Sequence, residues 1–363
     1  MVKYREARRG QRGTYIMKYE KNNLNRKLLI AGMILLAAAG GGQLAARNLK
    51  SFGSWYALRV YSILVSVVGR IWGILPVSAA ELGLYGLAIG AVWYGWNRRK
   101  DWRSIASRAV LVVGAAAFLY TYQCGINYYR KPFSSELELD TRQSSVAELA
   151  ELCRYLTEKV NETADDAFYE YRWASWGQEA MENLGQIYPG LSGYYPRPKP
   201  VAVSWILSVQ QLCGIYSPFT VEANYNRQMP SYNIPHTLCH ELSHLRGYMR
   251  EDEANFIGYL ACIHSDRQCF QYSGYLTGWV YATNALVGQD QDTYYQLYDS
   301  LCPRAVEDLR ENSEFWNHYE GKVAEVANQM NDTYLKINDQ EEGVRTYGRM
   351  VDLMLAHYRQ IEK

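Results

Sequence analysis

The sequence predicts a mainly α protein built in two parts: three N-terminal transmembrane helices, followed by an α+β domain with a small β-sheet and many helices. The charge is divided along the chain. Residues 1–130 carry a net charge of about +15 and residues 131–363 about −14, although the whole chain of 363 residues carries only +1. The long uncharged runs lie in the basic part. A chain divided in this way is expected to form a membrane domain over residues 1–130 and a second domain over residues 131–363.

Three apolar runs in the basic part are expected to cross the membrane. Residues 28–46 and 109–129 contain no charged side chain, and residues 77–96 contain only Glu81. Runs of this kind approach or reach the roughly 20 residues that a helix needs to cross a hydrocarbon core. Soluble helices rarely continue so far without a charge.

Residues 54–75, between the first two runs, are expected to form an amphipathic helix in the membrane interface. Arg59 and Arg70 interrupt this segment, and its apolar side chains recur every three or four residues. A fourth membrane span is the alternative. Basic residues before the first run and at 97–108 are expected on the cytoplasmic side. Three spans then place residues 131–363 outside the cell membrane, whereas a fourth span would place them inside.

The acidic part is expected to contain helices at 144–162 and 173–187, a loop at 187–200, and further helices from Pro235 onward. Short strands are expected at 201–205 and 220–226. The second strand alternates polar and apolar residues, which predicts one face on a core and one exposed polar face. Such a strand could bind an extended peptide by strand addition, or it could be an ordinary edge strand. The cysteines include no CxxC pair, and we expect buried thiols rather than disulfides.

The sequence HELSH, from His240 to His244, has the spacing of a metal site. Positions four apart lie on one face of a helix, so both imidazoles can bind one Zn²⁺. Glu241 lies about 100° round the helix, where it can act as general base on a zinc-activated water. His236 extends the spacing, but eight residues of helix rise about 12 Å, which is too far for a shared ion. We therefore place His236 at the start of the helix.

The third ligand is expected beyond Gly247, which is a natural stop for the helix. A second helix starting near Met249 carries Glu251 and Asn255 on one face. Glu251 is the favoured third ligand, with Glu253 as the rival. Asn255 is expected to accept a hydrogen bond from a ligand histidine and fix its ring.

Candidates for stabilising the transition state are Tyr272, Tyr275 and His264, which are chosen only because they are near in sequence. A tyrosine or histidine near the metal would supply the hydrogen bond that a developing oxyanion needs. No pattern in the sequence distinguishes among the three.

The residues His240-Glu241-x-x-His244 and Glu251-x-x-Ala254-Asn255 resemble the gluzincin metallopeptidases. That resemblance implies a zincin-like domain in which Glu251 binds zinc and Asn255 orients a histidine. Gluzincins have Asp where this chain has Asn255, so the orienting residue here carries no charge.

The wider chain resembles an uncharacterised bacterial membrane family, catalogued as domain of unknown function 3810. The matching stretches include GINYYRKP, GIYSPFTVEANYN and HELSHLRGYMREDEANFIGYLAC. The resemblance implies a multi-pass protein of the bacterial cell membrane, and it carries no established substrate.

Together these features predict a membrane-anchored zinc metallopeptidase that acts on a peptide or protein substrate in the cell envelope. Its partners would be the lipid bilayer and that substrate. The alternative is a zinc-stabilised binding or sensor domain without turnover. Nucleic-acid binding is disfavoured, because the basic residues flank the apolar runs and the second part is acidic.

Overall fold

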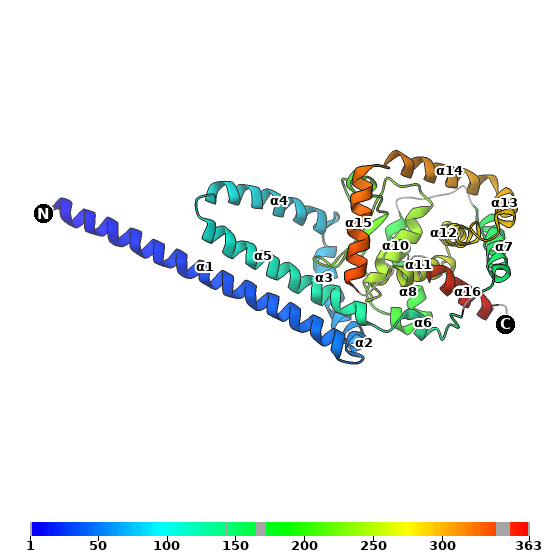
Figure 1. Ribbon diagram of the computed structural model, residues 1–363, viewed down its shortest axis with the longest axis horizontal. Coiled ribbons are helices and arrows are strands. Elements are labelled where there is room, and N and C mark those ends of the chain that lie inside the picture. Colours follow the sequence, from blue (N-terminus) through cyan, green and yellow to red (C-terminus); the bar gives the residue numbers. More distant parts are fainter. Residues whose placement is uncertain (1, 143, 165–171, 339–348, 362–363) are drawn as a thin grey trace.

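Three helices lie side by side as a bundle that projects from the rest of the molecule: α1 (Val2–Asn48), α4 (Ala79–Arg98) and α5 (Trp102–Gln123) (Figure 1). The computed structural model describes residues 2–142, 144–164, 172–338 and 349–361. Helices α1 and α5 approach backbone to backbone. A Cβ atom added to Gly32 would lie 2.6 Å from the Val110 carbonyl oxygen, and one added to Gly114 would lie 2.4 Å from the Gly32 oxygen. Small residues permit such close packing between membrane helices.

Three of the described helices are long and apolar enough to cross a membrane: Tyr19–Asn48, Phe52–Gly73 and Trp102–Tyr129. The first and last contain the predicted spans 28–46 and 109–129. The helix Phe52–Gly73 coincides instead with residues 54–75, the segment expected in the membrane interface. The predicted span 77–96 is α4, which does not reach the same apolarity, yet it leaves large apolar side chains exposed, as a lipid-facing helix does. These are Leu82, Leu84, Leu87, Ile89, Val92, Trp93 and Trp96.

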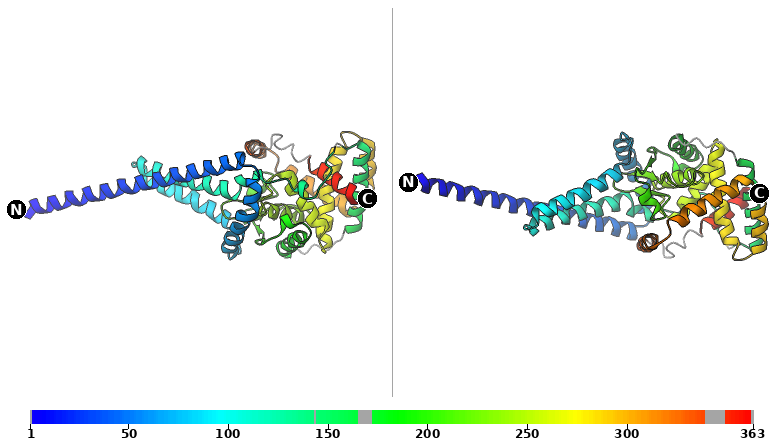
Figure 2. Two further views of the ribbon diagram at one scale, coloured as in Figure 1. Left: turned by 90° about the horizontal axis from the view of Figure 1, so that it is seen from below. Right: turned by 90° about the horizontal axis from the view of Figure 1, so that it is seen from above.

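The segment after α1 forms α2 (Phe52–Tyr56) and α3 (Ser62–Gly73), joined by one wider π-helical turn at Ala57–Tyr61. These helices run across the bundle rather than along it, at the end that adjoins the rest of the molecule (Figures 1 and 2). A span would have to run with α1, α4 and α5. The crosswise orientation therefore favours the interfacial location over a fourth span.

The remainder of the chain is helical around a small sheet, with α10, α11 and α12 at its centre (Figure 1). The predicted helices at 144–162 and 173–187 are confirmed as α7 and α8. Ser145 and Glu148 form a reciprocal capping box at the start of α7. The helices are α6 (Phe133–Glu136), α7 (Val146–Thr163), α8 (Trp173–Ile187), α9 (Trp205–Ser208), α10 (Asn233–His244), α11 (Glu251–Ile263), α12 (Gln268–Leu286), α13 (Gln291–Asp299), α14 (Pro303–His318), α15 (Lys322–Ile337) and α16 (Arg349–Ile361).

The sheet contains three short strands in the order β1-β3-β2: β1 (Lys199–Pro200), β2 (Gly214–Ser217) and β3 (Glu222–Tyr225). Strand β3 pairs parallel with β1 and antiparallel with β2. The predicted strand at 201–205 is wrong, because the chain turns there into α9.

The exposed polar face predicted for 220–226 is also wrong, because β3 is the central strand and all four of its residues are buried. Burial is possible because the Glu222 carboxylate is compensated. It lies 2.5 Å from the Lys199 Nζ and accepts the backbone N–H groups of Ala79 and Ala80 at 3.3 and 2.9 Å. Charges are rarely buried unless they are paired in this way.

One hydrophobic core extends across the predicted boundary at residues 130–131. Tyr61, Val65 and Ile126 belong to it together with Leu242 and Leu245 of the α+β part. The two parts are therefore packed as one unit.

Glu81 is the one acid in the three predicted spans. It accepts the backbone N–H groups of Ala202 at 2.7 Å and Val203 at 2.9 Å, so it lies at the junction with the α+β part. All seven cysteines fall within the described residues, and none of them forms a disulfide.

Candidate metal centre

The end of α10 and the start of α11 bring the predicted ligands together. Helix α10 ends at His244, and Gly247 has φ +85°, a left-handed conformation that glycine adopts without strain. The predicted helix stop at Gly247 is therefore confirmed. Helix α11 begins at Glu251, two residues later than the start predicted at Met249.

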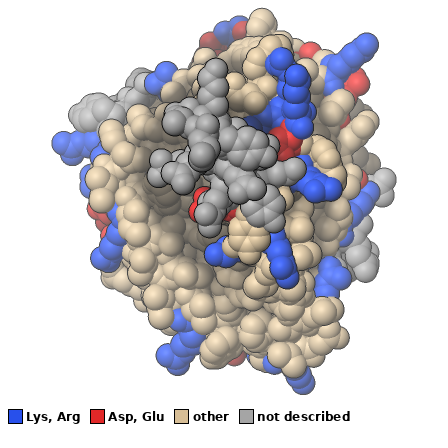
Figure 3. Space-filling view, turned by 90° about the vertical axis from the view of Figure 1, so that its left-hand side faces the viewer, with Lys and Arg blue, Asp and Glu red and all other residues tan. Residues whose placement is uncertain are grey.

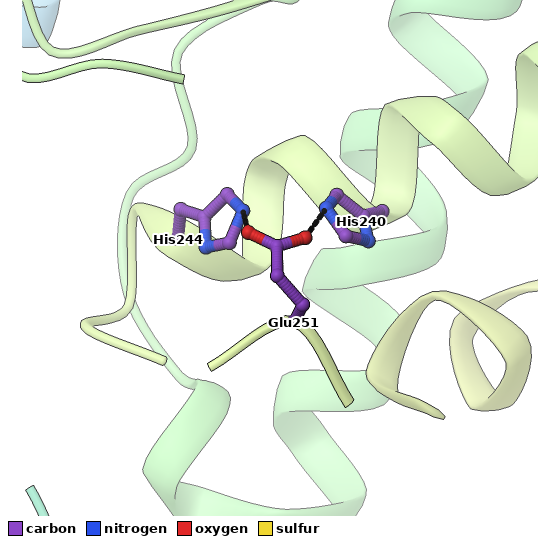
Figure 4. A group of neighbouring side chains, drawn as sticks. All are labelled: His240, His244 and Glu251. Atoms are coloured by element: carbon purple, nitrogen blue, oxygen red, sulfur yellow. Dashed lines mark ion pairs between the residues drawn. The ribbon is translucent and has the colours of Figure 1, made fainter. Parts of the chain in front are cut away.

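His240, His244 and Glu251 each offer one ligand atom, and these atoms lie within 4.8 Å of one another. The Nε2 of His240 is 3.3 Å from one carboxylate oxygen of Glu251, and the Nε2 of His244 is 4.0 Å from the other. Figure 4 shows the two rings from α10 on either side of this carboxylate. Two imidazoles and a carboxylate with one open position is the donor set of catalytic zinc sites.

Both histidines are held through their second nitrogen. The Nδ1 of His240 is 2.8 Å from the Asn255 Oδ1, and the Nδ1 of His244 is 2.7 Å from the backbone oxygen of Tyr248. An Nδ1–H donated to these acceptors leaves each Nε2 lone pair directed at the shared space. Asn255 thus occupies the position that the resemblance implies. The Tyr248 carbonyl was not predicted, because a backbone acceptor leaves no signature in residue type.

The ionisation of the cluster follows from the buried Glu251 carboxylate. Burial alone would lower the pKa of His240, but the hydrogen bond and charge of Glu251 raise it to about 9. Burial likewise opposes ionisation of Glu251, yet the bond to His240 holds its pKa below the usual range. Burial lowers the pKa of His244 to about 4, so this ring is a neutral donor. The cluster therefore contains a carboxylate and a neutral imidazole at His244, the forms in which these groups bind metals, whereas His240 must release a proton before its Nε2 can bind one.

Glu241 lies beside the cluster and is left with unused hydrogen-bonding capacity. Its Oε1 is 4.0 Å from the His240 Nε2, and no described residue bonds its buried Oε2. Burial raises the pKa of Glu241 to about 8. Gly214 of strand β2 makes room for this side chain, since a Cβ at Gly214 would lie 2.5 Å from the Glu241 Oε1.

The other candidates from the sequence lie outside the cluster. The His236 Nε2 bonds the Asn255 backbone oxygen at 3.0 Å, in keeping with its place at the helix start. Glu253, the rival ligand, accepts the backbone N–H of Phe133 at 2.8 Å. Tyr272 donates to Asp308 Oδ2 at 2.6 Å.

The two remaining transition-state candidates are also engaged elsewhere. His264 Nδ1 bonds the Leu260 oxygen at 2.9 Å, and the Tyr275 ring packs edge-on against Tyr155 and Tyr259. Nearness in sequence was a poor guide here, because α12 turns Tyr275 into the core and His264 lies exposed at the end of α11.

Two tyrosines that the sequence analysis missed connect the centre to the membrane part. Tyr61 donates a hydrogen bond to the backbone oxygen of His244 at 3.0 Å, and its hydroxyl lies 2.8 Å from that of Tyr216. Tyr216 in turn donates to the Gln123 oxygen at the end of α5, at 2.7 Å, and its ring centroid is 5.9 Å from that of His244. No sequence signal joins these residues, because they are brought together only by packing.

Comparison with known proteins gives one match, which covers residues 56–355. The chain belongs to the family described as Protein of unknown function (DUF3810). The match includes α3, α4, α5 and the candidate metal centre. No curated protein and no solved structure matches the chain.

Proposed function

We propose that this member of the DUF3810 family is a membrane-anchored, zinc-dependent metallopeptidase that hydrolyses peptide bonds, with Glu241 as general base. The observation that carries the proposal is the convergence of His240, His244 and Glu251, whose ligand atoms lie within 4.8 Å of one another. Beside them stands the Glu241 carboxylate, with one buried oxygen unbonded among the described residues.

The residues present fit a zinc ion. The Nδ1 atoms of His240 and His244 are engaged by Asn255 and Tyr248, so both Nε2 atoms are available. A bound Zn²⁺ would act as a Lewis acid and lower the pKa of a water molecule to near neutrality.

Glu241 supplies the proton acceptor. Burial raises the pKa of the Glu241 carboxyl, and the positive charge of a bound Zn²⁺ would favour the carboxylate form that a general base needs. Gly214 brings strand β2 against Glu241, and β2 is an edge strand, since the sheet order is β1-β3-β2. An extended substrate can pair with such an edge. Strand β2 therefore replaces residues 220–226 as the proposed peptide-binding strand.

The α+β part is proposed to lie outside the cell membrane, in the bacterial cell envelope. The bundle of α1, α4 and α5 would make three crossings, with α2 and α3 in the interface. The basic residues at 97–108 lie at the end of the bundle remote from the α+β part (Figure 1). Basic loops remain on the cytoplasmic side.

A zinc-stabilised binding or sensor domain is the second candidate, and the closure of the site favours it. The exposed fraction of the side chain is 12% for His240, 7% for His244 and 19% for Glu251. A site this closed suits a permanently bound structural ion, whereas a peptidase would need to open for its substrate.

The decisive experiment measures zinc content and peptide cleavage on the purified full-length protein. Wild type is expected to bind one zinc ion, His240→Ala to lose it, and Glu241→Gln to keep it while losing cleavage of a broad peptide library. Zinc in wild type without cleavage, and no effect of Glu241→Gln in vivo, would support the sensor. Undiminished cleavage by Glu241→Gln would exclude the proposed mechanism.

A further inference from the structure

Helix α15 carries an apolar stripe that the fold does not cover. Val323, Val326, Met330 and Ile337 recur at helical spacing and are 58%, 54%, 68% and 67% exposed. We call these four residues the α15 stripe. Ala324 and Leu335, on another side of the helix, are 4% and 0% exposed. The helix therefore packs on the protein through one side and leaves the stripe without a partner among the described residues.

The C-terminal end of α15 is anchored to α5, at the end of the bundle that adjoins the α+β part. Tyr120, in the last turn of α5, donates a hydrogen bond to the Asn338 Oδ1 at 2.8 Å. The Tyr120 ring meets that of Tyr334 edge-on, with centroids 6.3 Å apart, and the Tyr128 hydroxyl is 3.0 Å from that of Tyr334. These contacts set the C-terminal end of α15 level with the end of α5.

Helix α15 also has the orientation of an interfacial helix. It crosses the inner end of the bundle in Figure 1 and is seen nearly end-on in both views of Figure 2. Helix α3 likewise runs crosswise at this level and leaves Ile63, Val67, Ile71 and Ile74 exposed. Two helices thus present apolar stripes at the same end of the bundle.

We propose that α15 lies on the bilayer surface and inserts the α15 stripe into the outer leaflet, as a second interfacial helix on the opposite side of the bundle from α3 (Figure 2). An interfacial helix buries its apolar face about 5–10 Å into the boundary between headgroups and acyl chains. An apolar partner also fits the face that this end of the molecule presents. Viewed along the bundle from its N-terminal end, the molecule shows a broad area without charged side chains, with Lys and Arg toward the rim (Figure 3).

A second copy of this chain is the other possible cover for an apolar helix face. The bilayer is favoured because the end of α15 is tied to the last turn of α5, and because α3 also leaves apolar side chains exposed at this end of the bundle. This proposal does not depend on metal binding or on hydrolysis.

The test places an environment-sensitive fluorophore on α15 in the full-length protein, reconstituted in nanodiscs that contain anionic lipid. Met330→Cys and Val326→Cys carry the label on the α15 stripe, and Glu325→Cys is the matched control on the polar side of the same helix. Cys213 and Cys302, the two partly exposed cysteines, are replaced by Ser in all variants.

Labels at 330 and 326 are expected to emit at shorter wavelength than the label at 325. They should also be quenched several-fold more strongly by a lipid nitroxide near the headgroup. Equal emission and quenching at 325 and 330 would overturn the proposal, because the stripe would then face water. A short-wavelength signal without lipid quenching would also overturn it, and would indicate a protein cover such as a second copy.

Discussion

Asn255→Leu is expected to weaken zinc binding without removing a ligand. The Asn255 Oδ1 accepts the bond from the His240 Nδ1 at 2.8 Å, and Asn255 is 5% exposed. Without this acceptor, the metal-bound ring would hold a buried, unsatisfied N–H, which costs about 1–3 kcal/mol. The metal-free ring can rotate away, so the penalty falls mainly on the bound state. Loss of a partner of this kind lowers metal affinity by about 10–100-fold, or roughly 1.4–2.8 kcal/mol.

Competitive titration with a chromogenic chelator measures this change directly. Asn255→Asp is expected to tighten binding, because it adds a charge and replaces an amide nitrogen that no described residue bonds. His236→Gln is the matched control, since the His236 Nε2 contacts only the backbone oxygen of Asn255 at 3.0 Å. Wild-type affinity in Asn255→Leu, with zinc lost in His240→Ala, would refute the orienting role.

Lys199→Met leaves the Glu222 carboxylate buried without its cation. The loss should destabilise the protein by about 3–5 kcal/mol and lower its melting temperature in detergent. An unchanged melting temperature would contradict this reasoning. Gly214→Ala should displace Glu241 and reduce peptide cleavage at unchanged zinc content, unless the strand shifts to accept the methyl group. Burial lowers the pKa of His357 to about 4 from 6.5, so as the pH falls below 6.5 the unfolded chain binds a proton that the folded chain does not. Between about pH 6.5 and pH 5, wild type should therefore lose about 2 kcal/mol more stability than His357→Phe, as measured by melts of both proteins.

Local sequence rules predicted that His240, His244 and Glu251 lie together, because the three residues occupy one short stretch. Helical spacing sets His240 above His244, and the glycine stop at Gly247 returns the chain so that Glu251 faces them. Each step depends on neighbouring residues only, which is the range over which helix periodicity and capping operate.

The strand prediction failed where long-range compensation decides burial. The alternation at 220–226 indicated an exposed polar face, but Glu222 is buried because Lys199 neutralises it from the neighbouring strand β1. Tyr61 and Tyr216 could not be assigned to the site for the same reason. Their contacts with His244 join elements that are far apart in the chain, and the pattern of residues in one sequence does not predict such long-range contacts.

The tie between Tyr61 and the His244 carbonyl has a consequence for how the chain is made. The ribosome synthesises α1 to α5 before α10, so these helices can assemble before the later residues are available. The later residues then complete their fold against this surface. Leu242 and Leu245 pack into the same hydrophobic core as Tyr61, Val65 and Ile126. A fragment that starts at residue 131 would lack that surface. Expression of the α+β part alone should therefore give an aggregation-prone product rather than a stably folded domain.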